Sequence, residues 1–180
     1  MPPHCDALDG PVVKAAVRAL EAGDVEIALP FVYEKGEPEV REAFAKTIEA
    51  RNAGGMAQGV ADRWFFETVV RVHRAGEGAP FTGLKPAGLD HGPVIPVAER
   101  ALESGSADEL ISLLTEVVAH ETKEKFDHAM TLKARAGQGL PQAREYTSAM
   151  LGLQVWANKL HTCVKTDPHA SHAAYENHED

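Results

Sequence analysis

Three adjacent residues near the N-terminus, His4, Cys5 and Asp6, concentrate more reactive chemistry than any other stretch of the sequence. Imidazole nitrogen and thiolate sulfur are ligands for zinc, nickel, copper and iron rather than for magnesium or calcium. A thiol beside an imidazole is also the pattern of a reactive cysteine, whose thiolate attacks a substrate. The following Gly10-Pro11 turn predicts a segment that folds back onto the protein. The alternative is an ordinary flexible terminus with an incidental cysteine.

A long helix predicted over residues 107–135 supplies a second group of candidate ligands. Its apolar stripe, drawn at about 100° per residue, continues through or beside Glu121, Glu124 and His128. Glu124 and His128 lie one turn apart on one face. Inward-facing Glu and His residues on adjacent turns are how helical bundles build metal sites. The alternative is that the core narrows here, so that these side chains are half exposed and Glu124 pairs with a lysine at the surface.

A third candidate, His73, lies on a helix predicted over residues 56–75. It projects onto the apolar face that is centred between Phe65, Phe66 and Val69. A single histidine on such a face is also compatible with a hydrogen-bonded core residue. Similarly placed Glu and His residues on the other helix favour a shared metal site instead.

These observations predict one centre that binds a transition-metal ion, which would be Ni, Fe, Cu, Zn or Mn. Cys5 is the candidate catalytic residue, because its thiolate would tune the ion or act on substrate. The full predicted ligand set is His4, Cys5, His73, Glu121, Glu124 and His128.

An internal repeat organises the elements that must position these residues. Gly10-Pro11-Val12-Val13 and Gly92-Pro93-Val94-Ile95 are separated by the same offset as Glu42 and Glu124, and as Trp64 and Tyr146. A shared offset over separate segments indicates a duplication of two helical halves, about 10–75 and 92–157. A site built on the repeat would be asymmetric, because the position in the first half that is equivalent to His128 is occupied by Lys46.

Each half reads as one short helix followed by two long ones. Gly-Pro begins the short helices, and Gly23 and Gly105 end them. The long helices are expected at about 38–52, 56–75, 107–135 and 141–165. No run of residues alternates between apolar and polar with the two-residue period of a β-strand. We therefore expect an all-α fold, a bundle of four long helices plus short ones, in a single domain over residues 1–166. The polar residues 167–180 are expected to be a disordered tail.

Composition excludes several functional classes. The 180-residue chain has a net charge of −9 and no basic stripe, which argues against nucleic acid as a partner. No apolar run reaches the roughly 20 residues that span a membrane, and the N-terminus lacks the features of a secretory signal. Two cysteines are too few for a disulfide framework. We therefore expect a cytoplasmic protein without a membrane partner; homo-oligomerisation is compatible with the sequence.

The motif His4-Cys5-Asp6-x-x-x-Gly10 resembles the N-terminal hook of the nickel superoxide dismutases, His-Cys-Asp-x-x-Cys-Gly. The resemblance implies that His4 is an imidazole ligand and that Cys5 ligates through its thiolate and backbone amide. Asp9 replaces the second hook cysteine here. Over its whole length the chain resembles a family of uncharacterised small prokaryotic proteins with a Pro-His-Cys-Asp motif and a Trp-Phe-Phe-Glu-Thr helix, which implies no function.

Three functional hypotheses follow from the sequence. The first is a metal-dependent enzyme, most simply an oxidoreductase acting on a small-molecule substrate that the sequence does not identify. The second is a metal carrier or storage protein without turnover. The third is a helical interaction module whose histidine and glutamate residues are incidental. Elemental analysis separates the third hypothesis from the other two.

Overall fold

The structure is a computed structural model that describes residues 3–166, and these residues form helices and connecting loops without a strand. This confirms the all-α prediction. The chain divides into two compact units, residues 1–91 and residues 92–180. The expected single domain over 1–166 stays a prediction, and each unit is described here by itself. The expected disordered tail, 167–180, lies outside the described residues.

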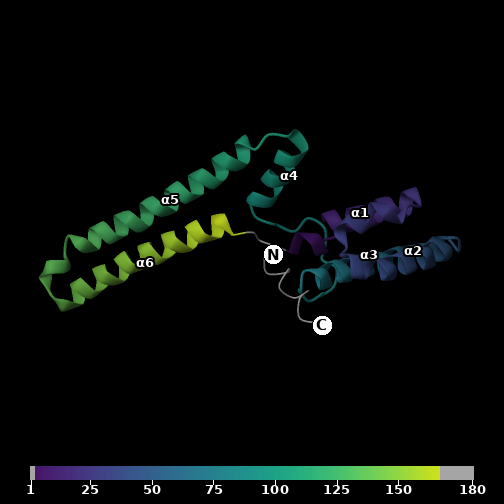
Figure 1. Ribbon diagram of the computed structural model, residues 1–180, viewed down its shortest axis with the longest axis horizontal. Coiled ribbons are helices and arrows are strands. Elements are labelled where there is room, and N and C mark those ends of the chain that lie inside the picture. The colour runs from purple at the N-terminus through teal and green to yellow at the C-terminus, as the bar shows by residue number, and fades with distance from the viewer. Residues whose placement is uncertain (1–2, 167–180) are drawn as a thin grey trace. The chain divides into compact units, whose positions relative to one another are not determined.

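The first unit contains three main helices: α1 (Pro11–Ala22), α2 (Glu37–Arg51) and α3 (Gly55–Gly76) (Figure 1). Short 3₁₀ helices precede and connect them: η1 (Pro3–Asp6), η2 (Val25–Ile27), η3 (Leu29–Phe31) and η4 (Glu34–Gly36). The α1 helix begins at Pro11, whose missing N–H costs nothing in a first turn, and ends at Gly23 in the left-handed conformation with φ 68°.

The hydrophobic core of the first unit lies where α1, α2 and α3 meet. Phe65 of α3 is fully buried and packs edge-to-face against Phe44 of α2, with ring centroids 5.6 Å apart. The other buried apolar side chains of the three helices recur at helical spacing: Val12, Val13, Ala16, Ala19 and Leu20 on α1, Val40 and Ala43 on α2, and Val69, Val70 and Val72 on α3. This core holds the C-terminal end of α3 in place, and that end carries His73.

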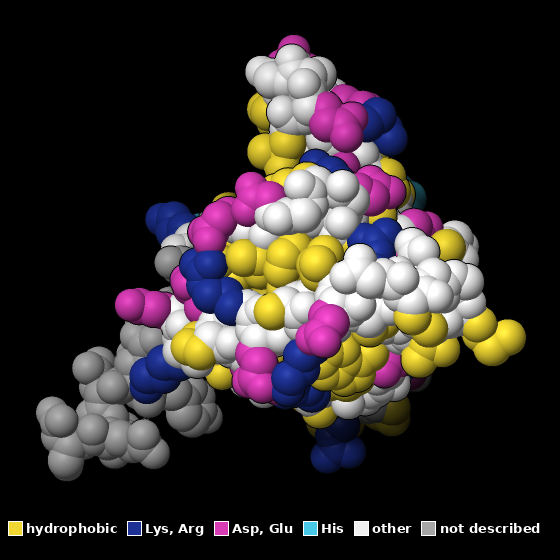
Figure 2. All heavy atoms as spheres, turned by 90° about the vertical axis from the view of Figure 1, so that its right-hand side faces the viewer, with side chains coloured by type: hydrophobic (Ala, Val, Ile, Leu, Met, Phe, Trp, Pro, Cys, Tyr) yellow, Lys and Arg dark blue, Asp and Glu magenta, His cyan; other side chains and the backbone are white. Residues whose placement is uncertain are grey.

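Hydrophobic side chains also reach the surface of the first unit. A shallow apolar groove runs along α2 and α3, where Met56, Val60 and Trp64 follow one another by one helical turn. Figure 2, which faces the end where α1, α2 and α3 lie, shows hydrophobic side chains in patches between acidic and basic ones.

The second unit contains α4 (Val94–Ser104), α5 (Asp108–Lys133), the 3₁₀ helix η5 (Ala136–Gln138) and α6 (Leu140–Lys165). The two 26-residue helices α5 and α6 lie side by side as an antiparallel hairpin (Figure 1). Among the described residues of this unit, only Val97, Ala129 and Leu132 are buried hydrophobics. Each unit has the order of one short and two long helices that the repeat predicts; the duplication itself stays a prediction.

No helix within residues 3–166 is both long enough and apolar enough to cross a membrane.

Candidate metal centre

The loop that follows α3 holds the N-terminal segment against the first unit. Lys85 donates its backbone N–H to the carbonyl of Asp6 at 2.8 Å, and Leu8 donates to the carbonyl of Lys85 at 3.0 Å. Gly88 adds a third backbone donor, 2.8 Å from the Asp9 carboxylate. The two backbone–backbone bonds form a single parallel bridge between Ala7 and Lys85. The segment that carries His4 and Cys5 therefore folds back onto the protein, as the sequence predicts.

A buried ion pair joins this segment to α3. The Arg74 guanidinium donates from Nε to Oδ1 of Asp6 at 2.6 Å, and both side chains are almost completely buried, with exposed fractions of 7% and 5%. Arg74 also donates from a terminal nitrogen to Glu77 at 3.1 Å. A buried charge is tolerated only when it is paired and hydrogen-bonded. Asp6 therefore positions its neighbour Cys5 and is committed to Arg74.

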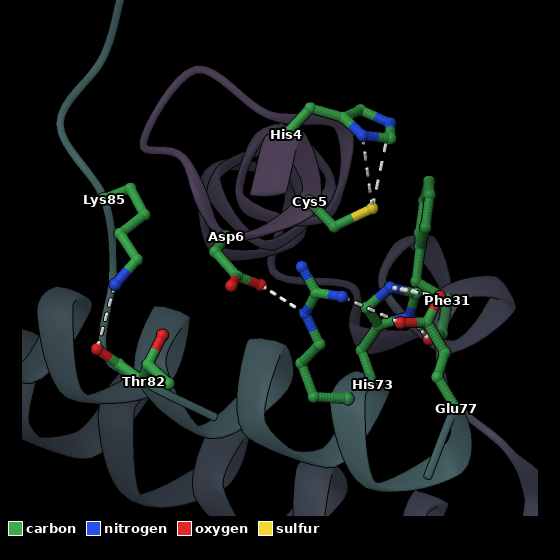
Figure 3. A network of polar contacts seen from close by, with 9 residues as sticks. His4, Cys5, Asp6, Phe31, His73, Glu77, Thr82 and Lys85 are labelled. Atoms are coloured by element: carbon green, nitrogen blue, oxygen red, sulfur yellow. Dashed lines mark hydrogen bonds and ion pairs between the residues drawn. The ribbon is translucent and has the colours of Figure 1, made fainter. Parts of the chain in front are cut away.

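Cys5 lies between the His4 ring and the polar groups of α3 (Figure 3). Its Sγ is 3.8 Å from Nε2 and 4.0 Å from Nδ1 of His4, so the sulfur lies against the imidazole ring. A second imidazole, that of His91, contacts the His4 ring edge-to-face with centroids 5.9 Å apart. The Nδ1 atom of His91 is buried and has no hydrogen-bond partner. The N-terminal segment thus brings the His4 imidazole and the Cys5 thiol close to a second imidazole, that of His91.

The Cys5 thiol is held in its protonated form. Burial raises the pKa of Cys5, and the negative charge of Glu77 raises it further, whereas the positive charge of Arg74 lowers it. A nucleophilic cysteine requires the opposite shift, toward the thiolate. The surroundings of Cys5 therefore do not favour a free nucleophile.

His73 has a fixed orientation at the C-terminal end of α3. Its Nδ1 lies 2.8 Å from the carbonyl oxygen of Phe31. A carbonyl only accepts, so Nδ1 carries the proton and donates it. Nε2 is buried, has no hydrogen-bond partner, and lies 3.4 Å from Oε1 of Glu77. The contact with Glu77 is an ion pair only when Nε2 is protonated as well.

The structure gathers three of the six predicted ligands, His4, Cys5 and His73, in the first unit (Figure 3). The other three lie on α5 in the second unit. Glu121 is half-buried and pairs with Lys125 at 2.8 Å, which lowers the pKa of its carboxyl group. Glu124 and His128 are exposed. The sequence alternative was a lysine pair for Glu124, whereas the ion pair that the structure shows is that of Glu121.

Glu77, Arg74 and His91 were not among the residues predicted from the sequence to form the site. Glu77 follows His73 by one helical turn, and this spacing was the available signal. Nothing in the sequence indicates that Arg74 reaches Asp6, because 68 residues separate them. Within residues 3–166, no three His, Cys, Asp or Glu side chains surround a common point as metal ligands would.

The chain belongs to a protein family described as a family of unknown function, DUF6448, whose match covers residues 9–156. The matched range includes α1 to α5 and most of α6. It begins after His4, Cys5 and Asp6, so the match does not test the N-terminal motif. Comparison with curated proteins and with solved structures finds no match.

Proposed function

We propose that the first unit binds one transition-metal ion at a centre formed by His73 of α3 and Glu77 at the C-cap of that helix, together with His4 and Cys5 of the N-terminal segment. The observation that carries the proposal is the buried, unpartnered Nε2 of His73, which faces the Glu77 carboxylate at 3.4 Å. A lone pair and a carboxylate that face each other in a buried place require a cation between them. That cation is either a proton or a metal ion.

The orientation of His73 favours the metal ion. Histidines that ligate metals almost always donate their second ring N–H to a carbonyl or a carboxylate, which fixes the ring and its tautomer. His73 makes this contact with the Phe31 carbonyl. Glu77 is held in turn by Arg74, so both side chains are oriented before any ion binds.

His4 and Cys5 supply the softer ligands. A thiolate and imidazoles beside one carboxylate suit Zn, Ni, Cu or Fe better than Mg or Ca, and Mn is the remaining candidate. The four side chains must turn toward one ion, because no three of them surround a common point. His91 is a further candidate ligand, since its buried Nδ1 is unpartnered next to His4.

The metal content of the purified protein tests the proposal. Elemental analysis should find about one ion per chain, and removal with a chelator should lower the melting temperature, because the unfolded chain has no preformed site. Cys5→Ser and His73→Asn should each lower occupancy at limiting metal by at least about tenfold, and the matched Cys163→Ser and His161→Asn should not. Full occupancy in both site variants would refute the centre.

His128→Asn decides whether the second unit contributes, as the sequence predicts. Loss of metal in this variant would add His128 to the ligands, whereas unchanged occupancy would restrict the centre to the first unit.

A redox reaction is the catalytic role that we propose for a bound Fe, Cu, Ni or Mn ion. Stepwise addition of ascorbate and then hydrogen peroxide to the loaded protein should change its visible or electron paramagnetic resonance spectrum reversibly. A spectrum that neither reagent changes, with metal that exchanges freely with a chelator, would favour the carrier or storage alternative.

The competing candidate is a structural clamp without metal. Arg74 and a protonated His73 would then pair with the two oxygens of Glu77, as the distances of 3.1 and 3.4 Å allow. Purified protein without stoichiometric metal, whose melting temperature is the same before and after chelation, would favour the clamp.

A further inference from the structure

The apolar groove along α2 and α3, called here the α2–α3 groove, has the size of a small-molecule site. Its volume is about 590 Å³, and small alanines on both helices leave this space open between them. Met56, Val60 and Trp64 follow one another by one turn, so they line about 12 Å of α3 at the rise of an α-helix. Mostly apolar sites of about 300–1,000 Å³ are typical of small-molecule ligands.

A buried hydroxyl without a partner lies at the bottom of the α2–α3 groove. Thr47 is fully buried and lines the groove, and its Oγ1 has no hydrogen-bond partner. A threonine inside a helix can donate to the carbonyl four residues earlier. Five others in this structure do so: Thr68, Thr122, Thr131, Thr147 and Thr162. Thr47 lies within α2 but does not make this bond, and an unsatisfied buried hydroxyl is costly, so a partner is expected from the groove.

The charges around the groove indicate an uncharged ligand. Among the described residues that line it, Lys46 alone is charged, and its ammonium group lies 2.5 Å from the Glu42 carboxylate. The glutamates of the adjoining surface are paired as well: Glu39 with Arg71, and Glu67 with Arg63. The groove therefore offers no unpaired charge to an anion or to a cation, and burying a charge without a partner is costly.

We propose that the α2–α3 groove binds a small, uncharged, elongated apolar molecule that carries one hydroxyl or carbonyl group. The apolar body lies along Met56, Val60 and Trp64. The polar group hydrogen-bonds with the Thr47 hydroxyl, which can both donate and accept. This site is separate from the proposed metal centre, because none of the residues that line the groove belongs to that centre.

Binding of 1-octanol to the full chain tests the proposal. Trp64 and Trp156 are the two tryptophans, so a Trp156→Phe variant reports on the groove through the fluorescence of Trp64. Octanol should change this fluorescence with saturation, and octanoate and octylammonium should each bind at least about tenfold more weakly. Val60→Asp should weaken octanol binding at least about tenfold. The matched Val155→Asp, at a 53% exposed valine of α6, should leave it unchanged.

Thr47→Val determines whether the hydroxyl serves a ligand or a buried water. Valine has a similar shape without the hydroxyl, so the variant should raise the melting temperature of the ligand-free protein and weaken octanol binding about threefold to tenfold. A lower melting temperature with unchanged octanol affinity would indicate a buried water and overturn the proposal.

Four other results would also overturn the proposal. They are octanol binding that does not saturate, octanoate or octylammonium binding as tightly as octanol, and an equal loss of binding in Val155→Asp and Val60→Asp. The fourth is a Trp64 fluorescence that changes on dilution and not with octanol, which would assign the groove to a second copy of the chain.

Discussion

Replacing Asp6 with alanine should destabilise the first unit and release the N-terminal segment. The change leaves the Arg74 guanidinium, only 7% exposed, without its partner at 2.6 Å. Removing one partner of a buried pair costs about 3–5 kcal/mol. Glu77 still contacts Arg74 at 3.1 Å, so we expect the lower end, about 3 kcal/mol. With a slope of about 2 kcal/mol per molar, the urea midpoint would fall by about 1.5 M.

Urea unfolding followed by circular dichroism measures this loss, and thiol labelling gives a second signal. Cys5 is buried and Cys163 is exposed, so the native protein should label quickly at one thiol, and Asp6→Ala should label quickly at both. Glu26→Ala is the control, because it removes an ion pair with Arg41 at the surface, where solvent screens the charges. A loss no larger than that of Glu26→Ala, with Cys5 still protected, would refute the argument that the ion pair is buried and holds the segment.

Two further predictions concern the N-terminal segment. Gly10→Ala should lower the free energy of unfolding by about 2 kcal/mol or more, because an added Cβ would lie 1.9 Å from the carbonyl oxygen of His4. The control Gly59→Ala, in open space within α3, should instead raise the free energy of unfolding by about 0.5–1 kcal/mol. Equal effects of the two substitutions in thermal unfolding would contradict the close approach at Gly10. The stability of the metal-free protein should also depend on Cys5 in the alkaline range. Folding raises the pKa of this thiol, so its contribution is complete below the unfolded value of about 8.5 and declines as the pH rises through the higher folded value. The difference in unfolding free energy between native protein and Cys5→Ser should therefore shrink above about pH 8.5, by at most about 1.4 kcal/mol per pH unit, and a widening difference would mean that the fold stabilises the thiolate.

The helices could be placed from the sequence because local residues begin and end them. The boundaries predicted at about 38–52, 56–75, 107–135 and 141–165 each lie within two residues of those observed. Proline at a first turn and glycine in the left-handed conformation act within one helical turn, so no distant contact is needed to recognise them. The 3₁₀ helices between Val25 and Gly36 were not predicted, although the Asp24 side chain caps the first of them and a proline, Pro30, lies in the first turn of the second.

The candidate site was only partly predictable. His4, Cys5 and His73 were selected because their residue types and helical spacing suit metal ligands. On the same grounds Glu121, Glu124 and His128 were added from α5, where the structure shows a lysine pair for Glu121 and exposed side chains for the other two. A helical wheel shows which residues share a face, but it does not show whether another helix covers that face.

The sequence by itself determined the helical class, the helix boundaries and the presence of a thiol and an imidazole in a segment that folds back. These properties depend on residues close together in the chain. Only the tertiary structure decided that Asp6 pairs with Arg74, that the Phe31 carbonyl fixes the tautomer of His73, and that Glu77 faces the free nitrogen of that ring. The first two contacts join residues 68 and 42 positions apart. Helical periodicity cannot predict such contacts, because they form only when the core of α1, α2 and α3 brings the loops together.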